Sequence, residues 1–139
     1  MELIKKRAGI IVAAFVLCGS FFVSSALGDE KNDGWKAPAS AEKLTNPMKG
    51  NDDATKKGEE LYGQMCAICH GDDGEGDGMA GGNLNPPPTD FTSDITQKQS
   101  DGALFWKLTE GKAPMASYKS MLSEEKRWQL VNYIRSLKK

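Results

Sequence analysis

The chain has 139 residues with 18 Lys or Arg, 19 Asp or Glu and one His, so its formal net charge is −1. This length accommodates one domain. Such a balanced charge argues against nucleic-acid binding, which depends on a basic surface. It does not indicate which kind of protein partner docks.

Residues 1–28 have the organisation of a secretory signal peptide. Three basic residues at positions 5–7 precede an apolar run, and Ala26 and Gly28 fit the −3 and −1 places of a cleavage site. Cleavage after Ala26 fits nearly as well. The alternative is an uncleaved membrane anchor, because the 20 uncharged residues 8–27 are about what a bilayer span requires. Removing residues 1–28 leaves 15 basic and 18 acidic residues, about −3.

Residues 29–51 are polar and contain two glycines and two prolines, so an irregular N-terminal extension is predicted. Its sizeable apolar residues are Trp35, Leu44 and Met48. A tryptophan in a polar arm favours packing against the following domain. A mobile linker is the alternative, and the sequence leaves it open.

A domain is predicted over 52–139, beginning with an amphipathic helix capped by Asp52 or Asp53. Apolar residues recur at helical spacing from Leu61 to Ile68. Gly58 lowers helix propensity by roughly 1 kcal/mol relative to Ala, and it would also allow another helix to approach closely. This helix leads into the motif that follows it.

Residues 66–70 have the sequence Cys-Ala-Ile-Cys-His, the C-x-x-C-H pattern of covalent c-type haem attachment. The thiols of Cys66 and Cys69 can form thioethers with the two vinyl groups on one porphyrin edge. The imidazole of His70 can then bind the iron as the proximal ligand. Since His70 is the only histidine, the second axial ligand is Met, another side chain, water or nothing.

The C-x-x-C pattern has two alternative interpretations, namely half of a zinc site and a thioredoxin-like redox pair. Zinc would need two more ligands, but the remaining cysteine, Cys18, lies in the apolar N-terminal run. A thioredoxin-like pair would need a βαβ pattern, and no strong strand pattern is nearby. With both exported cysteines in the motif, none is left for a disulfide, and a buried haem would stabilise the small domain instead.

The segment after the motif is a loop rich in glycine and acidic residues. Acids at positions 73, 75 and 77 match the start of a calcium loop, but Leu84 stands where a bidentate Glu is required. We therefore expect solvated acids, with glycines supplying unusual backbone angles near the haem. One carbonyl of Pro86–Pro88 is the candidate partner for the other ring nitrogen of His70, and a stiff polyproline spacer is the alternative.

Two further helices are predicted near the C-terminus. One is capped by Ser100 or Asp101, runs through Thr109 and is ended by Gly111. The other is capped by Ser123, has acidic residues in its first turn, and carries apolar residues every three positions as far as Leu137. Its expected role is to close against the first helix.

The loop between these helices holds two methionines. Met115 is the better candidate for the distal iron ligand, because Pro114 stiffens its approach and the loop has room to reach the far haem face. Met121 is the alternative ligand, although its position just before the helix cap favours inward packing with Leu122. Met79 is the weaker third candidate, and an open site is the remaining possibility.

Together these segments resemble the class I monohaem c-type cytochromes of bacteria, over about residues 52–139. The resemblance rests on the residues Gly58-Glu59-Glu60-Leu61-Tyr62, Cys66-Ala67-Ile68-Cys69-His70-Gly71, Gly74-Glu75-Gly76-Asp77-Gly78, Pro86-Pro87-Pro88-Thr89-Asp90-Phe91, Leu104-Phe105-Trp106, Met115-Ala116-Ser117-Tyr118 and the end helix from Leu122 to Leu137. The family usually has proline directly after its ligand methionine, whereas Ala116 stands there in this chain.

The resemblance implies an all-α cytochrome c-like fold, with about three main helices around one covalent haem c and the first and last helices crossing. It implies His/Met axial ligation, export to the periplasm, and transient docking of redox proteins over an exposed haem edge. The expected function is electron transfer without catalysis, as a free carrier or a subunit of a larger oxidoreductase. The alternatives are a haem protein that binds or senses a small ligand, a minor peroxidase, and a haem-free zinc or thiol module.

Overall fold

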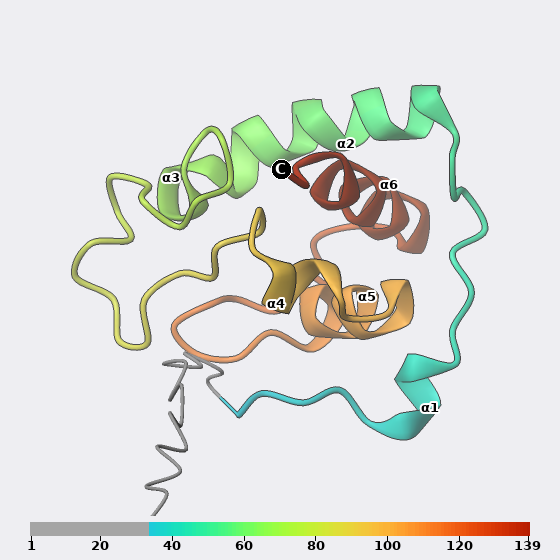
Figure 1. Ribbon diagram of the computed structural model, residues 1–139, viewed down its shortest axis with the longest axis horizontal. Coiled ribbons are helices and arrows are strands. Elements are labelled where there is room, and N and C mark those ends of the chain that lie inside the picture. Colours follow the sequence, from blue (N-terminus) through green and yellow to red (C-terminus); the bar gives the residue numbers. More distant parts are fainter. Residues whose placement is uncertain (1–33) are drawn as a thin grey trace, which may run out of the picture. The chain divides into compact units, whose positions relative to one another are not determined.

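The structure is a computed structural model that describes residues 34–139 (Figure 1). The predicted signal peptide or anchor, residues 1–28, lies outside the described residues, as do residues 29–33 of the extension. Within residues 34–139 no helix is long and apolar enough to cross a membrane. The described part is helical and has no strand. Its three longer helices are α2 (Asp52–Met65), α5 (Asp101–Glu110) and α6 (Glu124–Ser136).

The ends of these helices follow the predicted caps with one exception. Ser100 caps α5, Ser123 caps α6, and Gly111 ends α5 with a φ of +65° that favours glycine. The predicted cap of α2 is wrong, because Asn51 holds that place and its side chain accepts from the backbone N–H of Ala54 at 3.0 Å. The two aspartates after it lie in the first turn, where they favour the helix dipole.

Three helices of four residues each were not predicted from the sequence. A single turn is too short to show an apolar periodicity. One of them, α1, packs on α5 so closely that a Cβ added at Gly102 would lie 2.0 Å from the carbonyl oxygen of Ala41. The three short helices are α1 (Ala39–Glu42), α3 (Ala67–His70) and α4 (Asp94–Gln97).

Helices α2 and α6 pack against each other, as expected for the first and last helices (Figure 1). Gly58 forms the contact point, since a Cβ there would lie 2.0 Å from the backbone oxygen of Gln129. Tyr62 from α2 and Leu130 and Val131 from α6 are buried beside it. The predicted close approach at Gly58 is therefore confirmed, and this pairing carries α2 into the C-x-x-C-H turn.

The arm that precedes α2 is bound to the helices by buried amide side chains. Asn46 donates to the side-chain oxygen of Asn132 at 2.7 Å and to Asp101 at 3.2 Å. Asn132 in turn donates to the backbone oxygen of Met48 at 2.6 Å. Residues 34–51 are therefore packed against the domain, as the tryptophan favoured, and do not form a linker without contacts.

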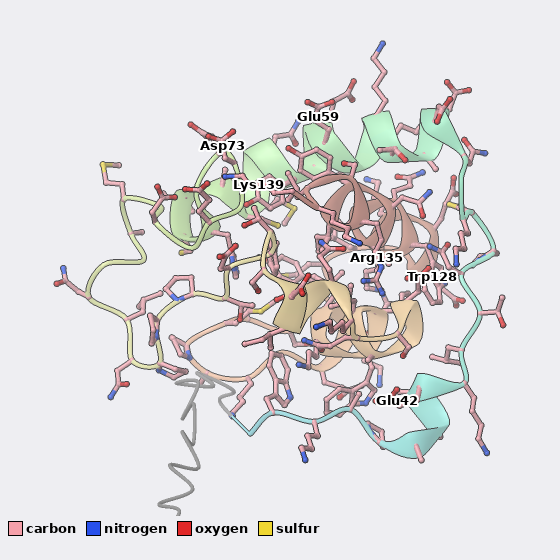
Figure 2. All side chains as sticks on the ribbon, viewed as in Figure 1. Glu42, Glu59, Asp73, Trp128, Arg135 and Lys139 are labelled. Atoms are coloured by element: carbon pink, nitrogen blue, oxygen red, sulfur yellow. The ribbon has the colours of Figure 1, made fainter. Side chains whose placement is uncertain are left out.

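Arg135 joins the C-terminal helix to the segment around α4 and α5 (Figure 2). Its Nε lies 2.7 Å from Asp101, and one of its terminal nitrogens donates to the backbone oxygen of Gln97 at 2.9 Å. Its other terminal nitrogen donates to the backbone oxygen of Gln99. The guanidinium therefore satisfies one carboxylate and two carbonyls, and it fixes α6 against the middle of the chain.

Candidate haem-binding site

An open cavity of about 250 Å³ lies beside the C-x-x-C-H turn. Its walls come from the end of α2, from α3, from the proline-rich segment 86–89, from α5 and from the loop 112–118. The cavity brings together Cys66, Cys69, His70 and Met115, which are separated by up to 49 positions in the sequence.

The two cysteines are presented by a single turn of helix. Cys66 ends α2 and is buried, whereas Cys69 lies in α3 and is half-buried. The backbone N–H of His70 donates to the carbonyl of Cys66 at 2.9 Å, so the turn is closed. Burial raises the pKa of the Cys66 thiol to about 12. A redox-active thiol of the thioredoxin type needs a lowered pKa, so this environment disfavours that alternative and suits an uncharged thioether.

The imidazole of His70 is oriented by a backbone carbonyl. Its Nδ1 lies 3.0 Å from the oxygen of Thr89, and its ring stacks on Phe91 with centroids 4.3 Å apart. Burial lowers the pKa of His70, although the bond to Thr89 acts in the opposite direction. The ring is therefore kept neutral, with Nδ1 engaged and Nε2 left to bind an iron.

The expected proline carbonyl is not the partner of His70. The acceptor belongs to Thr89, directly after the three prolines. The carbonyl of Pro88 faces the glycine loop instead, since a Cβ added at Gly76 would lie 2.6 Å from it. Successive carbonyls of an extended segment point to opposite sides, so the next one faces the imidazole.

The glycine loop covers the outer side of the C-x-x-C-H turn. The N–H of Gly76 donates to the carbonyl of His70 at 2.7 Å, and that of Gly78 donates to Cys69 at 3.1 Å. A Cβ at Gly78 would lie 2.5 Å from the carbonyl carbon of Cys69, so the loop needs glycine to approach this closely. The acids of the loop are exposed, as expected, and Glu75 pairs with Lys139 beside Asp73 (Figure 2).

Met115 is half-buried and lines the cavity from a tight turn. The N–H of Lys112 donates to the oxygen of Met115 at 3.1 Å, and the N–H of Met115 donates back at 2.8 Å. Met121 is 58% exposed and does not line the cavity, so its predicted inward packing is wrong. Leu122 alone is buried there, because neighbouring residues of the turn before α6 face opposite ways. Met79 is 91% exposed.

Several other residues line the cavity although the sequence did not assign them to it, among them Trp35, Met65 and Tyr118. Met65 belongs to the apolar face predicted for its helix, and its position next to Cys66 was the available signal. The hydroxyl of Tyr118 donates to the backbone oxygen of Met65 at 3.3 Å, which links the methionine loop to α2. For Trp35 the only signal was its occurrence in a polar arm.

The donor set of the cavity fits a haem. It offers two thiols, one oriented imidazole and the thioether sulfurs of Met65 and Met115 within walls formed by Leu108, Phe91 and other apolar side chains. Cys66, Cys69 and His70 stand on one helical turn, and Met115 reaches the cavity from the loop after α5. These residues could hold the haem from two sides. This fold with this donor set defines a c-type cytochrome, an all-α protein with covalent haem c.

The comparison with known families leads to the same class. Residues 53–134 match the family described as cytochrome c oxidase, cbb3-type, subunit III. More than half of the chain is matched, so the chain belongs to this family. It is a monohaem c-type cytochrome that takes part in haem electron transfer with redox partners.

Individual relatives share parts of the chain. A thiosulfate dehydrogenase of Stutzerimonas stutzeri (strain A1501) is 46% identical over 44 residues, which are 32% of this chain and 14% of that protein. The Kuenenia stuttgartiensis reducing HAO-like protein complex Kustc0457/Kustc0458 matches with a TM-score of 0.59 and 27% identity, over 69% of this chain and 50% of that one. The KustC0563 c-type cytochrome is 32% identical over 59% of this chain and 98% of its own, with a TM-score of 0.48. The matched part of this chain thus spans about a seventh of the length of the thiosulfate dehydrogenase and half of that of the HAO-like complex chain.

Proposed function

We propose that this protein is an exported electron-transfer cytochrome in which Cys66 and Cys69 carry the haem and His70 and Met115 are the axial ligands. The observation that supports this most directly is that one cavity collects all four side chains, whereas Met121 and Met79 lie outside it. Met65 also lines the cavity, but it directly precedes Cys66 at the end of α2, whereas Met115 comes from a separate loop. When bound, the haem supplies a one-electron couple between ferric and ferrous iron. His/Met ligation raises the potential of that couple relative to stronger donors.

The surrounding residues keep these donors in place and uncharged. The carbonyl of Thr89 holds the Nδ1–H of His70, which orients Nε2 and increases its basicity. Burial favours the neutral imidazole, and the thioether of Met115 carries no proton at any pH. Because neither ligand has to gain or lose a proton, a bound haem could change its oxidation state with little rearrangement of the protein atoms around it.

Ligand binding or peroxidase activity would need an open iron site with a polar group beside it. On the methionine side the wall includes Pro114, Met115, Ala116 and Tyr118, and Lys112 also lines the cavity with its ammonium over the Trp35 ring. The sequence has no second histidine, and the hydroxyl of Tyr118 already donates to the backbone of Met65. This lining favours electron transfer over the alternative.

The proposed setting is a redox system outside the cytoplasm. The signal-like residues 1–28 support export to the periplasm, with a membrane anchor if this segment is retained. One relative is named as a dehydrogenase and another belongs to a protein complex. We therefore propose that this chain passes electrons to or from a larger redox enzyme, as a carrier or as its haem subunit, and does not itself catalyse a reaction.

The test is the optical spectrum of the oxidised protein in the far red, where a weak sulfur-to-iron charge-transfer band reports methionine ligation. We expect the band in the wild type, its loss in Met115→Ala, and its retention in the control Met121→Ala. Carbon monoxide should bind the reduced Met115→Ala variant and not the reduced wild type. A band that survives Met115→Ala, or a wild type that binds carbon monoxide readily, would overturn this ligation.

A further inference from the structure

Trp35 brings the N-terminal arm to the cavity, outside the part of the chain that matches the family. The matched region begins at residue 53. The ring of Trp35 is one wall of the cavity, and it contacts Trp106 of α5 with centroids 6.1 Å apart and planes inclined by 56°. An aromatic pair in this range is stabilising, and the contact of these two half-buried indoles holds the end of the arm on α5.

Two cations lie over the Trp35 ring, and they belong to different elements. The Nζ of Lys107, on α5, is 5.3 Å from the ring centroid. The Nζ of Lys112 is 6.0 Å from it, and Lys112 is the first residue of the turn that ends at Met115. A cation within about 6 Å of an indole face is attracted to it. Trp35 therefore connects α5 to the turn that carries the methionine.

The Lys112–Met115 turn depends on such a support because it is narrow and exposed. Its two backbone hydrogen bonds, at 3.1 and 2.8 Å, run between Lys112 and Met115 only. Both residues between them, Ala113 and Pro114, are exposed. Met115 itself is half-buried and lines the cavity, so the direction of its side chain depends on the conformation of this turn.

We propose that Trp35 is a positioning residue for Met115: it supports the 112–115 turn through Lys112 and so keeps the methionine sulfur at the iron position. This inference rests on the proposed function, because it requires Met115 to be the distal ligand. It gives the N-terminal arm a role in setting the strength of the axial bond, and that role lies outside the family-matched domain.

The test is the dissociation constant of imidazole for the oxidised full-length haem protein, since imidazole must displace methionine to bind. Loss of an aromatic pair and a cation–π contact should tighten imidazole binding by roughly tenfold in Trp35→Ala. Trp35→Phe keeps a ring and should restore most of the wild-type value. The far-red band, recorded in the same titration, reports the methionine directly.

Two lysine variants distinguish the contact of Trp35 with the methionine turn from its contact with α5. Lys112→Gln removes the cation on the methionine turn and should tighten imidazole binding. Lys107→Gln removes the nearer cation, with the same change in net charge, and should leave binding as in the wild type because Trp106 still holds Trp35 on α5. These variants also carry the test if Trp35→Ala does not fold. Equal effects of the two lysine variants would overturn the proposal.

A Met115→Ala background distinguishes positioning from simple blocking of the cavity. If Trp35 acts through Met115, adding Trp35→Ala to Met115→Ala leaves imidazole affinity unchanged. An equal tightening in both backgrounds would show that Trp35 only restricts entry, and no tightening in either would show that it has no role. Both results refute the positioning. A Met115→Ala variant with an unchanged spectrum and imidazole affinity would instead refute the proposed axial ligand itself.

Discussion

Replacing Gly58 by alanine tests whether the α2–α6 contact depends on the absence of a side chain. A Cβ at this position would lie 2.0 Å from the backbone oxygen and 2.6 Å from the carbonyl carbon of Gln129. Non-bonded contacts of carbon are favourable at roughly 3.5–4 Å, so the helices must separate locally by about 1.5 Å or more. The obstacle is backbone, and rotation of a side chain cannot relieve it.

The expected effect is a net loss of stability. Overpacking in a well-packed core costs about 1–3 kcal/mol, and a clash with backbone belongs at the upper end. Alanine recovers roughly 1 kcal/mol of helix propensity. We therefore expect Gly58→Ala to lower the free energy of unfolding by about 2 kcal/mol and the melting temperature by about 10 °C for a domain of this size. Urea unfolding of the haem-loaded protein, followed by far-UV circular dichroism and haem absorbance, measures it.

Gly63 provides a matched control on the same helix. A Cβ there would meet nothing within 4 Å, so Gly63→Ala carries the propensity gain without the clash. It should raise stability by up to about 1 kcal/mol. If Gly58→Ala were as stable as Gly63→Ala, the close contact between α2 and α6 would not exist in solution, and the reasoning would be refuted.

Two further predictions concern the arm and a buried phenol. Asn46→Ala removes buried hydrogen bonds to α5 and α6 and should cost about 2 kcal/mol and accelerate tryptic cleavage within the arm. The exposed Thr45→Ala serves as control, and equal cleavage of both variants would contradict the expectation. Tyr62→Phe loses the bond to the Gly71 carbonyl at 2.6 Å and should cost about 1 kcal/mol near neutral pH. Burial holds the pKa of the Tyr62 phenol above its ordinary value of 10.0, so wild-type stability falls as pH rises beyond 10. Denaturant unfolding across pH should therefore show the deficit of the variant shrinking above pH 10, and a constant deficit would contradict the shift.

Local patterns determined the helices that are long enough to display them. Ser100 and Ser123 cap α5 and α6 as expected, because a cap bonds to its own first turn and needs no partner elsewhere. Asn51 was missed as the cap of α2 because two aspartates directly after it satisfy the same local rule. The four-residue helices carry no periodic signal, so only their contacts with longer helices reveal them.

Some features of the site could likewise be predicted from local sequence, whereas others depend on tertiary structure. The spacing of Cys66, Cys69 and His70 is a local property, so the sequence by itself determined the haem motif and the class of protein. Which carbonyl holds the imidazole depends on how the chain after Pro88 runs past α3, and only the tertiary structure assigned it to Thr89. Local sequence favoured Met115 over Met121 through Pro114 and the helix cap at Ser123, but only the tertiary structure places Met115 at the cavity and leaves Met121 exposed.

The placement of the N-terminal arm was decided by tertiary structure alone. No local pattern in residues 34–51 specifies that Trp35 reaches the cavity, because its partners Trp106 and Lys112 lie more than 70 positions away in the sequence. The sequence determined that a covalent haem can bind, through the C-x-x-C-H spacing of Cys66, Cys69 and His70 at the junction of α2 and α3. The packing of α2 on α6 and of the arm on α5 decided which distant side chains share that cavity, because such contacts depend on the whole chain.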